Sequence, residues 1–162
     1  KVDHRSSMRG ITFLVLAALS LVVHAVPQPL NYTSWSTVLM IGAHPDDIEG
    51  ASGGLVSILT KQNTQVYYLI LTNGDKGCSN PKCVDWTSEH IAFERQQEAL
   101  NAALELGIPS SHVTLLDYED GMVTSYAEES LRREIIQRIR HIKPEVVMSW
   151  YPYPNFQLLP SE

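Results

Sequence analysis

The sequence has few cysteines, no patch of basic side chains and no apolar run as long as a membrane-spanning helix. Only two of its 162 residues are cysteines, and this pair alone cannot make a structural zinc site, which needs four ligands. The net charge is −6, which argues against a nucleic-acid partner. No Gly-x-Gly-x-x-Gly follows the first predicted strand, which argues against a nucleotide-binding domain.

The N-terminal segment 1–25 has the layout of a secretory signal peptide. Met8 is the expected initiator, and an apolar run over residues 11–23 leads to Ala25 as the cleavage position. The run is shorter than the ~20 residues that cross a bilayer. An uncleaved membrane anchor, with membrane association, is the alternative. Either way, we expect entry into the secretory pathway at the endoplasmic reticulum.

Two further features agree with a secretory route. Residues 26–36 form a predicted linker, in which Asn31 begins an Asn-Tyr-Thr sequon for N-glycosylation. Cys78 and Cys83 bracket a turn-like Ser-Asn-Pro-Lys and would close a small disulfide loop in an oxidising compartment. Two free thiols in a surface loop are the alternative.

Residues 37–162 read as one α/β domain in which apolar strands alternate with helices. This alternation predicts a Rossmann-like parallel sheet with helices on both faces and at least four strands. The strands are expected at 37–43, 65–72, 112–118 and 145–151, and the helices at 47–63, 87–107 and 126–143. Ligands of such sheets bind beyond the carboxyl ends of the strands, so the loops there are the candidate functional segments.

The first of these loops contains a histidine and two adjacent aspartates. An imidazole and a carboxylate three residues apart, His44 and Asp47, can reach one divalent ion, and a neighbouring carboxylate, Asp46, can take a proton from its bound water. The alternative to a metal site is that one of the aspartates only caps the following helix. The small residues 50–54 that follow should let the helix approach the sheet and leave room for a ligand.

The stretch Ala-His-Pro-Asp-Asp-Ile-Glu-Gly-Ala-Ser-Gly-Gly, residues 43–54, resembles the signature of the PIG-L/LmbE-like deacetylases. Weaker similarities follow in the family's order over residues 37–151. The resemblance implies a Zn²⁺-dependent enzyme that removes acetyl from an N-acetylglucosaminyl conjugate. N-acetylglucosaminyl-phosphatidylinositol, on the route to GPI anchors, is the favoured substrate, and a small soluble GlcNAc conjugate is the alternative.

The resemblance also implies a role for each matching residue. His44 and Asp47 would be zinc ligands, and Asp46 the general base. Arg95 and Asp120 would contact the sugar. Alternatively, Arg95 would be a surface residue that pairs with Glu98. Asp120 would alternatively be only a residue of a turn.

One part of the family's metal site has no counterpart in the sequence. The family supplies a further histidine after the fourth strand, whereas no histidine follows His141 here. His112 and His141 are predicted at the opposite edge of the sheet, and nothing marks His90 as a ligand. We therefore expect a chain that is incomplete at its C-terminus and inactive by itself. An inactive sugar-binding module without a complete metal site is the alternative.

Overall fold

The computed structural model describes residues 31–125 and 128–150. The chain divides into two units, residues 1–31 and 32–162, and the first lies outside the described residues except for Asn31. The signal peptide or anchor predicted at 1–25 therefore stays a prediction. In the described part of the chain, no helix is long and apolar enough to span a bilayer.

The second unit is built on a four-stranded parallel sheet. Its strands follow the order β3-β2-β1-β4. They are β1 (Thr37–Gly42), β2 (Gln65–Thr72), β3 (Val113–Tyr118) and β4 (Val146–Met148). The chain runs from β1 through β2 to β3 on one side of the sheet and then crosses to β4, so the strand order reverses between β1 and β4. The parallel α/β sheet that the sequence predicts is confirmed.

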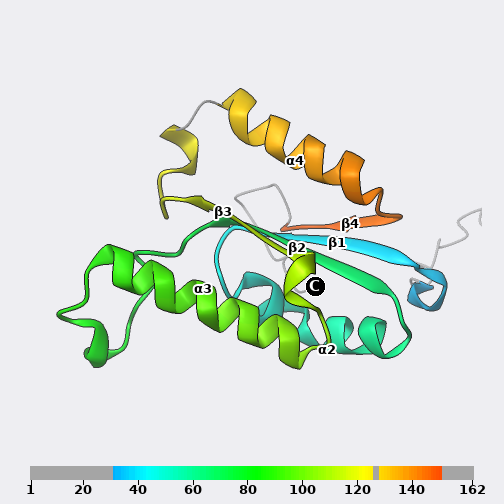
Figure 1. Cartoon of the computed structure of the whole chain (residues 1–162), viewed down its shortest axis with the longest axis horizontal. Coiled ribbons are helices and arrows are strands. Elements are labelled where there is room, and N and C mark those ends of the chain that lie inside the picture. The colour runs from blue at the N-terminus through cyan, green and yellow to red at the C-terminus, as the bar shows by residue number, and fades with distance from the viewer. Residues whose placement is uncertain (1–30, 126–127, 151–162) are drawn as a thin grey trace, which may run out of the picture. The chain divides into compact units, whose positions relative to one another are not determined.

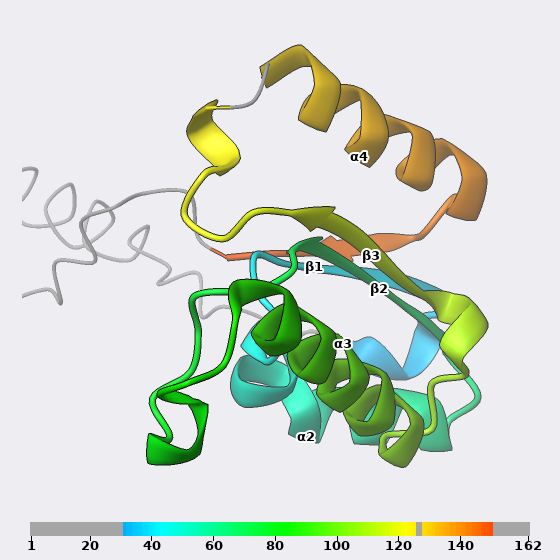
Figure 2. The same ribbon diagram turned by 60° about the vertical axis from the view of Figure 1, so that its left-hand side comes forward.

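Helices lie on both faces of this sheet, as expected. Helices α2 (Asp47–Lys61) and α3 (Ser88–Glu105) cover one face, and α4 (Glu128–Ile142) covers the other (Figures 1 and 2). The remaining elements are short 3-10 turns: η1 (Tyr32–Ser34), η2 (Pro81–Cys83), η3 (Ser110–His112) and η4 (Val123–Ser125). Thr87 caps α3, since its hydroxyl accepts a hydrogen bond from the His90 N–H at 3.2 Å.

The core lies between the sheet and the α2–α3 layer. Val38, Leu59 and Ile70 are completely buried there, and Tyr68 is 1% exposed. Alternate residues of β1 and β2 reach this layer because successive side chains of a strand point to opposite faces. The core therefore fixes α2, whose first turn follows the histidine–aspartate loop.

Two expectations about local structure are wrong. The fourth strand covers only Val146–Met148, because its pairing with β1 ends at Met40. The glycines of segment 50–54 do not bring α2 close to the sheet: a Cβ added at Gly50, Gly53 or Gly54 would meet no atom within 4 Å. These glycines therefore face open space.

A buried threonine joins the end of β2 to the residue that follows β1. Thr72 is 1% exposed, and both its N–H and its hydroxyl donate to the Ala43 carbonyl at 2.8 Å. Thr72→Val keeps the shape but loses the hydroxyl bond, so we expect the free energy of unfolding to fall by about 1 kcal/mol in chemical denaturation.

A second buried threonine at the opposite edge provides the matched control. The hydroxyl of Thr64 donates to the Trp35 carbonyl at 2.8 Å. Thr64→Val should destabilise the protein by a similar amount without touching the residues around His44. Unchanged stability of Thr72→Val would show that the hydroxyl bond of Thr72 contributes nothing to the stability of the protein.

Candidate active site

The loops after β1, β2 and β3 meet at the carboxyl edge of the sheet. They place His44 and Asp46 after β1, Asp75 and Lys76 after β2, and Asp120 after β3. Side chains of different loops contact one another here, as His44 and Asp120 do, so this edge is one site. This is the position at which open parallel sheets bind their ligands.

The loop after β1 turns sharply at Asp46. Its φ is 123° and its ψ −19°, a conformation that costs a non-glycine residue roughly 1–3 kcal/mol and is found mainly at functional sites. The Asp46 carbonyl accepts the Gly50 N–H at 2.8 Å, which begins α2, but its carboxylate makes no capping hydrogen bond. Asp46 is thus the N-cap residue of α2 by position, but its side chain does not cap the helix, and the capping alternative for the carboxylate is wrong.

His44 and Asp47 lie side by side, as their spacing predicts. The distance from His44 Nδ1 to Asp47 Oδ2 is 3.5 Å. The same carboxylate oxygen accepts the backbone N–H groups of Ala43 at 2.7 Å and His44 at 2.9 Å. These two bonds turn the Asp47 carboxylate back from the helix towards the imidazole and hold it there.

The donor atoms of this pair suit a divalent ion. An imidazole nitrogen beside a carboxylate oxygen is a usual part of a zinc site, which needs three protein ligands when it is catalytic. His44 and Asp47 fit two of these ligands. Within residues 31–125 and 128–150, however, no group of three His, Cys, Asp or Glu side chains is arranged to hold a metal.

Arg95 of α3 ties the loop after β1 to the loop after β2. Its side chain is only 14% exposed. The guanidinium donates to the carbonyls of Pro45 and, at 2.6 Å, of Gly77, and it lies 2.9 Å from Asp46 Oδ2. The alternative of a surface residue paired with Glu98 is wrong. Asp46, by contrast, keeps 73% of its side chain exposed while Arg95 holds one of its oxygens.

Asp120 reaches the same site from the loop after β3. Its carboxylate lies 3.0 Å from His44 Nε2, and its side chain is 15% exposed. It is also a turn residue, followed by Gly121 with a φ of 73°. His44 therefore has a carboxylate at each ring nitrogen, with Asp47 on one side and Asp120 on the other.

The sequence did not single out three residues that belong to this site. Asp75 and Lys76 hold the backbone of Asp120 through hydrogen bonds of 2.8 and 2.6 Å. Glu49 lies on the first turn of α2, and both of its carboxyl oxygens are buried without a hydrogen-bond partner among the described residues. Burial raises the pKa of Glu49, and the nearby Asp46 and Asp47 raise it further. Two signals pointed to the segment that contains Asp75 and Lys76: the length of the loop after β2, and the resemblance of residues 71–77 to the family's loop at this place.

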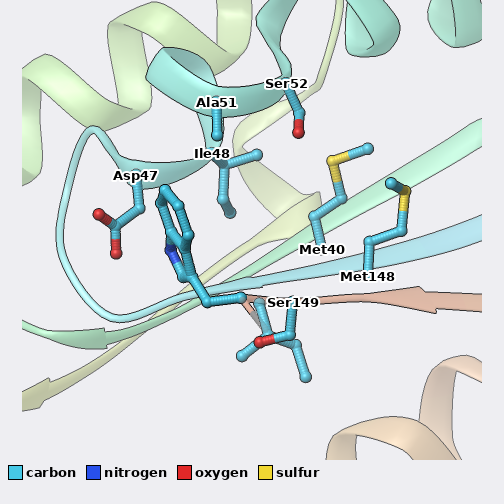
Figure 3. A pocket seen from close by; sticks show the side chains of 9 residues that line it. Met40, Asp47, Ile48, Ala51, Ser52, Met148 and Ser149 are labelled. Atoms are coloured by element: carbon cyan, nitrogen blue, oxygen red, sulfur yellow. The ribbon is translucent and has the colours of Figure 1, made fainter. Parts of the chain in front are cut away.

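A small pocket opens beside Asp47. Its cavity measures about 140 Å³ and lies between β1, β4 and the start of α2. Figure 3 shows the Asp47 carboxylate on one side of the pocket and the side chains of Met40 and Met148 on the other. Ile48 and Ala51 add to an apolar lining, so the pocket combines one carboxylate with an apolar wall.

Two other described histidines, His112 and His90, make their ring contacts elsewhere. His112 stacks on Tyr67 with ring centres 4.0 Å apart, and its Nδ1 lies 3.2 Å from the Val66 carbonyl near the start of β2. His90 meets Trp86 edge-on with ring centres 4.4 Å apart. Neither contact brings an imidazole to His44 and Asp47.

The loop after β2 is closed by a disulfide. Cys78 and Cys83 are joined, with Cα atoms 6.2 Å apart. Asn80 accepts the Lys82 N–H at 3.0 Å and so begins the 3-10 turn η2 inside the ring. The disulfide limits the conformations of a loop whose first residues contact Arg95 and Asp120.

Solved structures share this fold at low sequence identity. N,N'-diacetylchitobiose deacetylase from Pyrococcus horikoshii superposes with a TM-score of 0.68 and 22% identity, over 96% of this chain and 54% of that chain. The 4-carboxy-2-hydroxymuconate hydratase GalB from Pseudomonas putida gives a TM-score of 0.62 and 24% identity, over 73% and 49% of the two chains. At these identities the comparison shows the fold alone.

Curated relatives are somewhat closer in sequence. Diacetylchitobiose deacetylase of Thermococcus kodakarensis is 32% identical over 85% of this chain and 49% of its own length. Probable N-acetyl-alpha-D-glucosaminyl L-malate deacetylase 2 of Bacillus anthracis is 30% identical over 71% of this chain and 50% of its own length. The chain thus spans about half the length of these relatives.

The sequence also matches a family profile that includes the whole described site. The match covers residues 39–157 and is to the PIG-L profile, GlcNAc-PI de-N-acetylase. It spans the His44–Asp47 loop, Arg95 and Asp120, and it agrees with the resemblance found in the sequence. The chain belongs to the PIG-L family.

Proposed function

We propose that the whole protein is a metal-dependent N-deacetylase that hydrolyses the acetamide of an N-acetylglucosaminyl conjugate. The observation that carries the proposal is the placement of Asp46: Arg95 holds one carboxylate oxygen beside the His44–Asp47 pair, while 73% of the side chain stays exposed. A base that must meet water and substrate needs this combination of fixed position and access. Membership in the PIG-L family supports the same reaction.

In the proposed reaction Asp46 moves the proton. Its carboxylate accepts a proton from the attacking water as the water oxygen bonds to the acetyl carbon. The C–N bond then breaks, the proton passes to the departing nitrogen, and acetate and a free glucosamine amine are released. General-base catalysis of this kind contributes roughly 10²–10⁴-fold to the rate. Arg95 keeps the base in place through the 2.9 Å contact with Asp46 Oδ2.

His44 and Asp47 are the proposed ligands of a divalent ion, with Zn²⁺ favoured by their nitrogen and oxygen donors. Such an ion supplies Lewis acidity, which polarises the acetamide carbonyl. The chain's own contribution is to hold the two donors together through the hydrogen bonds to Asp47 Oδ2. Arg95 and Asp120 border the same site, and we propose that hydroxyl groups of the sugar bind to them.

The names of the family and of the relatives mention two kinds of aglycone. The family description names a phosphatidylinositol conjugate, and the two relatives described above are named for diacetylchitobiose and an L-malate conjugate. We propose a GlcNAc conjugate as the substrate, with either a lipid-linked or a small soluble aglycone. Acetate release measured with N-acetylglucosaminyl-phosphatidylinositol, diacetylchitobiose and GlcNAc-malate separates the two. Release from none of the three would refute the proposed function.

We further propose that the protein enters the secretory pathway, which the signal-like segment 1–25 and the sequon at Asn31 support. After expression in a eukaryotic secretory host, mass spectrometry should find a mature terminus near Val26 and a glycan on Asn31. Cys78 and Cys83 should be oxidised in that material. An intact Met8 terminus with unmodified Asn31 and reduced cysteines would instead indicate an anchored protein whose domain faces the cytosol.

A further inference from the structure

The loops after β2 and β3 are joined by a cluster of hydrogen bonds around Asp120, which contacts His44. Asp75 is 7% exposed, and its Oδ1 accepts the backbone N–H of Asp120 at 2.8 Å. Its own N–H donates to Asn73 Oδ1 at 3.1 Å, which closes the turn around Gly74. A buried carboxylate is costly unless it is hydrogen-bonded, so this contact fixes the loop after β3 against the loop after β2.

The other side of the same peptide is held by Lys76. Its ammonium donates to the Asp120 carbonyl at 2.6 Å and pairs with Glu119 Oε1 at 3.0 Å. The backbone of Asp120 is thus bound at its N–H by Asp75 and at its carbonyl by Lys76. A residue held at both backbone groups presents its side chain in one direction.

That direction is towards the imidazole of His44. Asp120 Oδ1 lies 3.0 Å from His44 Nε2, while His44 Nδ1 faces Asp47 Oδ2 at 3.5 Å. A neutral imidazole carries one proton, and a carboxylate at 3.0 Å stabilises that proton on the nearer nitrogen. Histidines that bind metals commonly donate their other N–H to a carboxylate, which sets the tautomer and the ring orientation.

We propose that Asp75 and Lys76 are positioning residues: they hold Asp120 so that its carboxylate keeps the ring proton of His44 on Nε2 and leaves Nδ1 free on the side of Asp47. Nδ1 of His44 and the carboxylate of Asp47 are then both placed to bind the same ion before it arrives. This role for Asp120 is separate from the sugar contact suggested above. The inference rests on the proposed function in that His44 and Asp47 act as metal ligands.

The test compares variants of Asp75 in the whole protein. Asp75→Ala removes the acceptor for the Asp120 N–H, whereas Asp75→Asn keeps an oxygen in the same place. In metal-free protein, long-range ¹H–¹⁵N NMR of the His44 ring should show the proton on Nε2 in the wild type and in Asp75→Asn. Asp75→Ala should show a mixture of both tautomers.

Zinc binding gives a second readout that needs no substrate. In competition with a chelator, Asp75→Ala should bind Zn²⁺ about 10–100-fold more weakly than the wild type, the usual effect of losing an outer contact of a metal ligand. Asp75→Asn should bind it within a few-fold of the wild type. Wild-type zinc affinity together with an unchanged Nε2–H tautomer in Asp75→Ala would overturn the proposal.

Lys76 provides a variant that leaves the buried part of the cluster intact. Its side chain is 50% exposed, so Lys76→Met should fold even if Asp75→Ala does not. We expect it to weaken zinc binding and mix the tautomers to a smaller extent. Lys82→Met, at an exposed position of the same loop, is the matched control and should change neither readout. Equal behaviour of Lys76→Met and Lys82→Met would also contradict the proposal.

These readouts separate the inference from the proposed function. A protein that binds zinc in the Asp75-dependent manner but releases no acetate would refute the deacetylase proposal alone. In an active enzyme, positioning predicts that Asp75→Ala lowers kcat, because the metal site itself is disturbed. A rise in KM with unchanged kcat would instead assign Asp120 to substrate binding only.

Discussion

Asp46→Asn is expected to lower kcat by roughly 10²–10⁴-fold while the divalent ion stays bound, because the substitution removes a base and keeps the metal ligands. The amide of asparagine keeps the size of the side chain and an oxygen that can accept from Arg95, which lies 2.9 Å from Asp46 Oδ2. It does not take up a proton from water. The measurement is kcat for acetate release together with metal content by elemental analysis.

Two matched variants make this result specific. Asp47→Ala removes a proposed ligand and should lose both the metal and the activity. Asp85→Asn changes an exposed carboxylate in the loop after β2 and should leave both unchanged. Loss of metal from Asp46→Asn as readily as from Asp47→Ala would show that the two aspartates have been given the wrong roles.

Arg95→Met is expected to lower both stability and activity. The arginine side chain is 14% exposed and donates to the Pro45 and Gly77 carbonyls, so its removal leaves two acceptors of the site without their charged donor. We expect the free energy of unfolding to fall by about 2–3 kcal/mol in chemical denaturation. The contact with Asp46 adds little to this loss, because that carboxylate is mostly exposed.

The activity of Arg95→Met should fall further than its stability explains, since Asp46 is no longer held. Arg95→Lys tests this point, because a lysine keeps the charge but cannot bind two carbonyls and a carboxylate at once. Arg138→Met on α4, an exposed position, is the control for losing an arginine. Wild-type kcat in a folded Arg95→Met protein would show that Arg95 does not position the base.

The sequence predicts the sheet well where apolar runs have clear ends. The strand expected at 65–72 is β2 at Gln65–Thr72, since its continuous apolar and β-branched residues are buried on both faces. The strand expected at 145–151 is shorter, because its length depends on pairing with β1 and this pairing stops at Met40. Such pairing cannot be read from the strand's own residues.

For the candidate site, too, the sequence predicts some contacts and not others. The proximity of His44 and Asp47 follows from a spacing of three residues around the start of a helix. The partners of Arg95 do not, because Pro45 is 50 residues away in the sequence and meets it only after α3 packs beside the loop. The contact of Asp120 with His44 likewise depends on how the loop after β3 is held by Asp75 and Lys76.

The glycines after the motif show the limit of reasoning from residue type. Small residues near a strand end suggest close packing of helix and sheet, yet Gly50, Gly53 and Gly54 face open space. The face of α2 that packs on the sheet is instead the one with larger apolar residues such as Val56 and Leu59, which are completely buried. Which face of a helix turns inward is decided by the whole apolar pattern.

The most direct test of the account is acetate release by the whole protein before and after metal removal. With an N-acetylglucosaminyl substrate that it accepts, the protein should release acetate and free amine in equal amounts. Removal of the metal by a chelator should abolish the reaction, and added Zn²⁺ should restore it in the wild type but not in Asp47→Ala. Acetate release that continues after metal removal, or metal-loaded protein that releases no acetate from any GlcNAc conjugate, would contradict the account.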